Sequence, residues 1–229
     1  MELPRSGRPF LESGILTTCV TNQVSDGAER KQCSRDSRDH SPRPVAAGRL
    51  GGACRLGLPV RSRSVKQPHP TYEQLVAMPA YAEQPVPVAF EDVNGHLNVR
   101  HYTGIASEGL DESLVELGIP QNWPFTGHAC FTAEHHLTYL AELRTGDTLS
   151  ARVRLLGRAE RAAHALVYLL DDSHQRLSFV MEEVFLHIDM ETRHTAAWPE
   201  DVAAALDQRI AADASLPWEP SVSGSMSLR

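Results

Sequence analysis

The clearest periodic pattern in this 229-residue chain is an apolar stripe that begins after residue 98. Apolar or small residues recur there at helical spacing, so a helix would carry all of them on one face. Asn98 is a residue type favoured at a helix N-cap, and Gly118 and Pro120 supply a stop signal. The stripe consists of Tyr102, Ile105, Ala106, Gly109, Leu110, Leu114 and Leu117. The pattern predicts one long amphipathic helix with a single buried face.

The chain that follows this helix shows the alternation typical of β-strands. Between residues 149 and 155, apolar residues alternate with Ser150, Arg152 and Arg154, which predicts a strand with one buried and one solvated face. Apolar runs bounded by turn signals predict further strands. The predicted strands cover residues 130–140, 149–155, 163–170 and 177–189.

Shorter elements flank this region. Residues 71–76 predict a helical turn, and the two prolines within 85–90 indicate an edge strand, since proline cannot donate to a sheet ladder. A second helix is predicted at 200–212, where Pro199 fits the first turn. Successive antiparallel strands need a partner layer, so the long helix must lie across the sheet. We therefore expect an α+β fold, with a curved antiparallel sheet wrapped around one long central helix.

The first 65 residues follow neither period and are rich in Arg, Ser, Gly and Pro. Such a segment buries too little apolar surface to offset its chain entropy, so we expect a disordered or non-native extension. A transit peptide would give the same pattern, as would a gene start placed too early, with translation beginning near Val65 or Met78. The expected organisation is an extension at 1–65, a linker with a short helical turn at 66–84, a domain at 85–216 and a flexible tail at 217–229.

Charge and cysteine usage narrow the class of protein. The chain has 12 Lys and Arg against 6 Asp and Glu through Lys66, and 10 against 23 from Gln67 onward. An acidic domain disfavours nucleic-acid binding, which needs concentrated positive charge. No apolar run reaches the roughly 18 residues of a membrane span, and no secretory signal is evident. The four cysteines match no zinc or disulfide spacing. We expect a cytoplasmic protein without nucleic-acid or membrane partners.

A short loop ahead of the long helix carries the strongest candidate chemistry. Its sequence, Asp92-Val93-Asn94-Gly95-His96-Leu97-Asn98, places a carboxylate, a glycine turn, an imidazole and a helix-capping amide within seven residues. The N-terminus of a helix stabilises negative charge, and a carboxylate beside it can activate water. An aspartate also caps its own loop in ordinary turns, so residue type alone leaves a structural role open.

Together with Tyr102, this loop resembles the acidic-x-x-Gly-His-x-Asn…Tyr signature of hotdog-fold acyl-CoA thioesterases, in the 4-hydroxybenzoyl-CoA thioesterase-like branch. The segment Leu143-Arg144-Thr145-Gly146-Asp147-Thr148-Leu149 resembles the Gly-Asp turn that opens the third strand in that family. The resemblance covers about residues 85–189. It implies hydrolysis of an acyl-CoA thioester to free acid and CoA, with no cofactor. It also implies a homodimer, or a homotetramer built as a dimer of dimers, with sites at the subunit interface.

The resemblance also assigns catalytic roles. Asp92 stands where this branch holds its catalytic carboxylate, as general base or nucleophile. The backbone N–H of Val99 stands where the family donates a hydrogen bond to the thioester oxygen. His96 and Asn98 match the rest of the signature and are expected to shape and orient the loop.

The acyl group is expected to contact a second set of residues. Gly95 lets the loop approach the acyl group closely, and Tyr102 is expected to border the acyl pocket. Glu134 and His136 alternate along a strand and share a face, which we expect to line the pocket beneath the helix. An acidic, aromatic-lined pocket suits a cationic acyl group. The chain is also similar to small thioesterases of carnitine and betaine breakdown, which implies a betainyl-CoA-like substrate.

Two departures from the family pattern leave alternatives open. Phe90 stands where many relatives carry a second acidic residue, and Val99 stands where a second asparagine is frequent. A related hotdog branch uses a glutamate on the helix, so Glu108 and Glu112 are alternative bases. A non-catalytic acyl-binding or dimerisation module and a hotdog dehydratase are alternative functions. The candidate contacts for CoA phosphates are Arg100, Arg144, Arg152 and Arg154.

Histidine-rich segments raise the question of a metal site. Convergence would have to involve His96, His101, His128, His135 and His136. Neighbouring histidines in this set do not share a face, and the chain has no His-Glu-x-x-His or Cys-x-x-Cys motif. We therefore predict no metal site.

Cys130 near His128 is a candidate nucleophile, although a small buried cysteine is the more common arrangement.

Overall fold

The structure of the chain is a computed structural model that describes residues 68–228, so the expectation for residues 1–65 lies outside the described residues. In chain order its elements are α1 (Tyr72–Val76), β1 (Tyr81–Pro85), the 3-10 turn η1 (Val88–Phe90), α2 (Val99–Val115), the 3-10 turn η2 (Trp123–Thr126), β2 (His128–Tyr139), β3 (Thr148–Arg158), β4 (Ala162–Asp171), β5 (Arg176–Asp189), β6 (His194–Thr195) and α3 (Glu200–Ala214).

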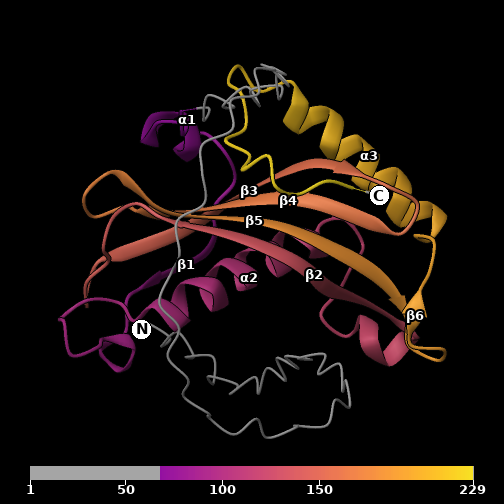
Figure 1. Cartoon of the computed structure of the whole chain (residues 1–229), viewed down its shortest axis with the longest axis horizontal. Coiled ribbons are helices and arrows are strands. Elements are labelled where there is room, and N and C mark those ends of the chain that lie inside the picture. The colour runs from indigo at the N-terminus through magenta and orange to yellow at the C-terminus, as the bar shows by residue number, and fades with distance from the viewer. Residues whose placement is uncertain (1–67, 229) are drawn as a thin grey trace, which may run out of the picture. The chain divides into compact units, whose positions relative to one another are not determined.

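The strands form one antiparallel sheet with the order β1-β3-β4-β5-β2, and β6 pairs with β5. The sheet arches over α2, which packs against β1, β3, β4 and β5 (Figure 1). The predicted α+β fold, with a curved antiparallel sheet around one central helix, is confirmed.

Helix α2 begins and ends where the sequence predicts. The Asn98 side chain accepts the N–H of Arg100 at 3.1 Å, and Gly118 has a φ of +82° beyond the C-terminal end. Gly109 is the point of closest approach to the sheet, because a Cβ built there would lie 2.4 Å from the Cβ of Ala151. The predicted stripe is buried as far as Leu114 (Tyr102, Ile105, Ala106, Gly109, Leu110 and Leu114), and Leu117 is half-buried.

The outer face of the sheet is also covered, which corrects the prediction of a solvated face on β3. Arg152 and Arg154 are 5% and 4% exposed. The Arg154 guanidinium stacks over the Trp218 ring at 4.3 Å and donates to the Trp218 carbonyl at 2.8 Å. Residues 217–228, predicted as a flexible tail, thus contribute side chains that pack on this face, and they include the buried Met226. Neither arginine is free to meet a CoA phosphate.

The ordered domain begins earlier than predicted. Within the proposed linker, β1 pairs with β3, and Leu75 of α1 is fully buried against the outer face of β4. The edge strand predicted at 85–90 is wrong, because the strand ends at Pro85 and residues 88–90 form a 3-10 turn. The two prolines of this segment lack the N–H groups that a longer ladder would need. Only Val86, which donates to the Asp147 carbonyl at 2.8 Å, extends the pairing.

Helix α3, predicted at 200–212, covers the part of β3 that β1 leaves unpaired. Arg209 donates to the Val153 carbonyl at 2.9 Å, and the Leu155 N–H donates to Asp213 at 2.7 Å. These two side chains replace a neighbouring strand and protect the edge from pairing with another chain.

Across residues 68–228, no helix combines the length and the apolar character needed to cross a bilayer.

Candidate active site

The loop between η1 and α2 is closed tightly by its own backbone. The Asp92 N–H donates to the His96 carbonyl at 3.0 Å, and the Gly95 N–H donates back to the Asp92 carbonyl at 3.0 Å. Gly95 has a φ of +79°, a conformation that glycine adopts at little cost. The Asn98 N–H then donates to the Phe90 carbonyl at 2.8 Å. The loop therefore delivers residue 92 to the start of α2.

A pocket of about 330 Å³ opens beside this loop. It brings together four of the predicted site residues, Asp92, His96, Val99 and Tyr102. The rest of its lining was not anticipated from the sequence and comes from Leu97, Tyr139, Leu140, Ala141 and Glu142. The pocket thus lies between the N-terminus of α2 and the end of β2.

The Asp92 carboxylate has both a structural and an accessible side. Its Oδ1 accepts the Asn94 N–H at 2.8 Å, which is the loop-capping contact expected of an aspartate in a turn. The side chain is 17% exposed and lines the pocket. His96 Nδ1 lies 3.8 Å from the same oxygen and 3.3 Å from the Leu97 carbonyl oxygen. The imidazole is thus held within the loop, next to the carboxylate.

The start of α2 supplies a hydrogen-bond donor to the same pocket. Val99 is the first residue of the helix, so its N–H has no acceptor within the helix. The Asn98 side chain accepts the next N–H, that of Arg100, and does not cap the Val99 N–H. Because Val99 and Asp92 line one pocket, a carbonyl group bound there would face a carboxylate and a helix N-terminus.

A ring stack holds the loop onto the first turn of the helix. Phe90 and His101 are parallel within 4°, with ring centroids 3.9 Å apart. Burial and the neighbouring Arg100 both lower the pKa of His101, so the ring is neutral at pH 7. Phe90 thus packs the loop against the first turn of α2.

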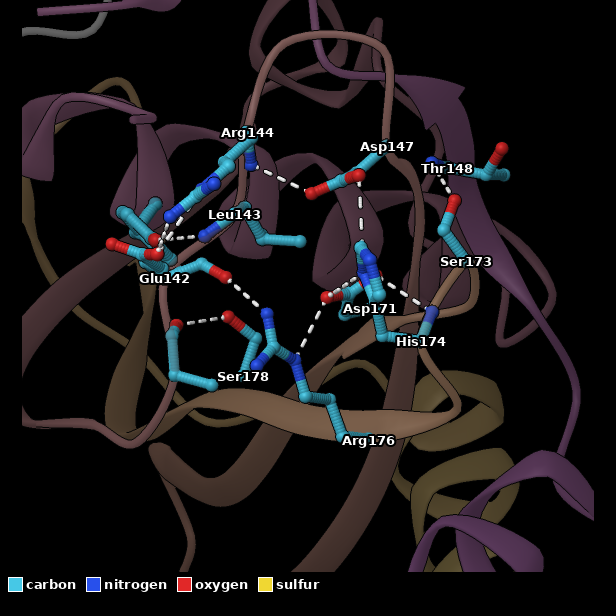
Figure 2. Close-up of polar contacts among 12 residues, drawn as sticks. Glu142, Leu143, Arg144, Asp147, Thr148, Asp171, Ser173, His174, Arg176 and Ser178 are labelled. Carbon is cyan, nitrogen blue, oxygen red and sulfur yellow. Dashed lines mark hydrogen bonds and ion pairs between the residues drawn. The ribbon is translucent and has the colours of Figure 1, made fainter. Parts of the chain in front are cut away.

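The far wall of the pocket is the segment that follows β2. Its carbonyl groups are tied to β5, because Ser178 donates to the Ala141 carbonyl at 2.6 Å and Arg176 donates to the Glu142 carbonyl at 2.8 Å (Figure 2). Arg176 is in turn paired with the buried Asp171 at 2.9 Å. No local motif marks this segment in the sequence, since its place in the site depends on the pairing of β2 with β5.

The expected position of Glu134 and His136 is wrong. These residues pair with Val184 and Glu182, whose side chains are on the outer face of β5, whereas His135 pairs with Glu183 on the face toward α2. The register shifts between Thr132 and Glu134, so one extra residue enters β2 there. Because strand side chains alternate, this bulge turns both predicted residues away from the helix. Neither lines the Asp92 pocket.

The alternative bases on the helix are also outside this pocket. Glu108 and Glu112 lie about 14 and 20 Å along the helix from Val99, at ~1.5 Å per residue. Glu112 accepts the Ala82 N–H at 2.6 Å and so fastens β1 to the helix. Of these three carboxylates, Asp92 is the one that lines the pocket at the N-terminus of α2.

The structure does not favour Cys130 as a nucleophile. Burial raises the pKa of its thiol, and the carboxylates of Asp111 and Glu183 raise it further. The reactive thiolate is therefore disfavoured. His128, its proposed partner, instead lies 3.0 Å from His187, between ring nitrogens.

The histidines considered for a metal site do not gather in residues 68–228. His101 stacks on Phe90, and His135 lies 3.1 Å from Glu183. Within the described residues, the group of three or more potential ligands whose atoms all lie within 4.8 Å of one another consists of Asp147, Asp171 and His174 (Figure 2). The Asp171 carboxylate already pairs with His174 and Arg176, so this group links two turns and anchors the pocket wall.

Known proteins are similar to this chain over the segment that contains the candidate site. A family model described as the thioesterase-like superfamily matches residues 86–206. A betainyl-CoA thioesterase from Pseudomonas aeruginosa is 31% identical over 137 residues, which cover 59% of this chain and 86% of that protein. An L-carnitine dehydrogenase/betainyl-CoA thioesterase from Agrobacterium fabrum is 28% identical over 116 residues, which cover 51% of this chain but only 24% of that longer protein.

Solved structures share the fold. A Staphylococcus aureus protein crystallised in complex with CoA superposes with a TM-score of 0.59 at 21% identity, covering 66% of this chain and 97% of that chain. A putative thioesterase from Pseudomonas putida gives a TM-score of 0.56 at 20% identity, with the same coverage of 66% and 97%. At these identities, the superpositions support the arrangement of sheet and helix alone.

Proposed function

The chain belongs to the thioesterase-like superfamily, and we propose that it hydrolyses an acyl-CoA thioester to a free acid and CoA. The observation that carries the proposal is that Asp92 and Val99, the first residue of α2, line the same pocket. The reaction needs a group that activates or replaces water and a group that stabilises the oxyanion, and this pocket has a candidate for each.

The proposed chemistry has Asp92 acting on the thioester carbonyl carbon. As a general base, Asp92 takes a proton from the attacking water; as a nucleophile, it forms an anhydride that water then hydrolyses. In either case the carbonyl oxygen becomes negative and accepts the Val99 N–H at the positive end of α2. CoA leaves as a thiolate, which needs little help from an acid, so His96 and Asn98 serve to shape the loop.

We propose an acyl group like that of betainyl-CoA, one that carries a quaternary ammonium. Support comes from relatives whose names include betainyl-CoA thioesterase, among them the Pseudomonas aeruginosa protein at 31% identity. The exposed Arg100 at the start of α2 is the candidate contact for a CoA phosphate, because it adjoins the pocket residue Val99. Cysteine usage supports a cytoplasmic location.

A homodimer, or a dimer of dimers, is part of the proposal. Strand β2 is at one end of the sheet order, and its outer backbone edge is open to pairing with a second copy. Phe131 on this strand, outside the pocket lining, is 36% exposed. Size-exclusion chromatography with light scattering tests this point, and a monomer at micromolar concentration would contradict it.

The activity is tested by measuring thiol release from a panel of acyl-CoA substrates that includes betainyl-CoA. We expect turnover by the unmodified chain and a loss of about 10²-fold or more in kcat for Asp92→Asn, a substitution that keeps the size but removes the negative charge. Glu108→Gln is the matched control on the helix. A greater loss in that control would move the carboxylate role to the helix. CoA binding without turnover would support a non-catalytic acyl-binding module, and hydration of an enoyl-CoA would support a dehydratase.

A further inference from the structure

We infer that Glu142 and Tyr139 determine the specificity of this pocket by recognising a quaternary ammonium in the acyl group. The inference rests on the proposed thioesterase function and adds to it the residues that distinguish a cationic from a neutral acyl group. Neither residue belongs to the loop motif, and both come from the far wall of the pocket, at and just beyond the end of β2.

The geometry of a betainyl group puts its cation in the same pocket as the reacting carbonyl. One methylene separates the two, so the nitrogen lies about 2.5 Å from the carbonyl carbon at standard bond lengths. A carbonyl placed between Asp92 and the Val99 N–H therefore leaves the ammonium inside the cavity of about 330 Å³. The groups available to contact it are the remaining lining residues of that cavity.

Two tyrosines provide aromatic walls for such a cation. The rings of Tyr102 and Tyr139 meet edge to face, with centroids 5.3 Å apart and planes at 82°. Tyr102 is 4% exposed and fixed in the core, while Tyr139 is 46% exposed and presents more of its surface. Aromatic faces attract quaternary ammonium groups, whose charge is spread over methyl groups and weakly hydrated. Tyr139 is therefore the more accessible aromatic contact for an incoming acyl group.

Glu142 adds negative charge on the same wall. The pKa of its carboxyl is lowered, first by the hydrogen bond from Arg144 and then by the charge of Arg144, so it is ionised at neutral pH. Arg144 donates to Oε1 of Glu142, at 3.1 Å from Nε, and Oε2 has no such contact within the described residues. Arg176 and Ser178 fix the backbone on which this side chain stands (Figure 2). Together with Asp92, Glu142 gives the pocket lining two carboxylates, which disfavours an anionic acyl group.

The test compares betainyl-CoA with 3,3-dimethylbutanoyl-CoA, which has the same shape with carbon in place of the charged nitrogen. The ratio of the two kcat/KM values isolates the contribution of charge, because the CoA part is common to both. We expect Glu142→Gln to lower the ratio about 5- to 10-fold at low salt. The effect should be smaller in 0.5 M salt, because the Debye screening length is then only about 4 Å. Tyr139→Leu lowers the ratio as well, and Tyr139→Phe largely restores it.

A substitution that should raise the kcat/KM ratio and a matched control that should leave it unchanged complete the experiment. Arg144→Gln removes the cation that pairs with Glu142 and should raise the ratio. Glu160→Gln, at an exposed carboxylate outside the pocket, should leave it unchanged. A ratio that is the same in Glu142→Gln, Tyr139→Leu and the unmodified chain overturns the inference and leaves the thioesterase proposal intact.

A binding measurement separates failure of the inference from failure of the proposed function. Saturation-transfer NMR with tetramethylammonium reports on cation binding without turnover, and we expect a weaker signal in Glu142→Gln than in Glu160→Gln. If no acyl-CoA is hydrolysed but this difference persists, the proposed reaction fails and the cation site stands. If the two variants bind tetramethylammonium equally, the cation site fails.

Discussion

The Tyr102 hydroxyl accepts the backbone N–H of Leu143 at 3.1 Å, in a contact where the two residues are 4% and 0% exposed. The Leu143 carbonyl in turn accepts the N–H of Leu97 at 2.7 Å. Leu143 is thereby bound both to the central helix and to the loop that carries Asp92. The two walls of the pocket are therefore joined through one residue.

Replacing Tyr102 by Phe should destabilise the fold because it leaves the Leu143 N–H buried without an acceptor. We expect a loss of about 1–3 kcal/mol in the free energy of unfolding, measured by urea denaturation. Tyr139→Phe is the matched control at a half-exposed ring, where the change should stay within about 0.5 kcal/mol. Equal stability of the two variants would show that the Tyr102–Leu143 contact adds nothing.

Substituting Val99 by Pro should remove the oxyanion donor while leaving the helix in place. Proline is tolerated at the first position of a helix, and Asn98, with φ −62° and ψ 137°, already has the conformation required before proline. We expect kcat to fall about 10²- to 10³-fold with little change in the circular dichroism spectrum. Val99→Ala retains the N–H and should keep most of the activity. An active Val99→Pro enzyme would rule out this amide as the donor.

Replacing each of two glycines of α2 by alanine should change the stability of the protein in opposite directions. At Gly109 the new Cβ would lie 2.4 Å from the Cβ of Ala151, so helix and sheet must separate, and we expect a loss of about 1–3 kcal/mol. At Gly104 a Cβ would meet no atom within 4 Å, and alanine should stabilise the exposed helix surface by about 0.5–1 kcal/mol. Thermal unfolding of the two variants measures both effects. A stabilised Gly109→Ala variant would contradict the close packing of α2 on β3.

The stability of the protein should depend on pH through Asp111. Although this residue keeps exposed surface, loss of hydration, followed by repulsion from Glu183 and Glu108, raises the pKa of its carboxyl to about 6. The folded state therefore holds a proton that the unfolded state releases between about pH 4 and 6. The contribution of this proton to the free energy of unfolding is complete below this pH window and is lost as the pH rises through 6.

Asp111→Asn should accordingly increase stability at pH 7.5, by less than about 1 kcal/mol because solvent screens an exposed group, and the gain should vanish near pH 4. Asp207 provides a control of opposite sign, since the hydrogen bond from Arg158 lowers the pKa of its carboxyl. Asp207→Asn should lower stability at pH 7.5, and its effect should disappear on acidification. Urea denaturation at a series of pH values measures both, and a pH-independent Asp111→Asn effect would refute the assignment.

Several features of the fold could be read from the sequence because they depend on neighbours in the chain. The N-cap at Asn98, the stop at Gly118 and the apolar stripe between them are set by helical periodicity, and α2 follows them. The loop that places Asp92 beside Val99 is closed locally, since the hydrogen bonds within it join residues at most eight positions apart, as between Phe90 and Asn98, while the Leu97 N–H ties it to the distant Leu143 carbonyl.

The tertiary structure alone decided which residues complete the pocket. Glu142 and Tyr139 line the same pocket as Asp92 because β2 pairs with β5, and that pairing leaves no short-range signal in the sequence. The same pairing contains the bulge that turns Glu134 and His136 outward, and one inserted residue is enough to exchange the faces of a strand. Alternation showed that Arg152 and Arg154 share a face, but only the folded C-terminal segment, with Trp218 over Arg154, determined that this face is covered. Periodicity specifies which side chains point the same way. What they point at is determined by contacts between distant parts of the chain.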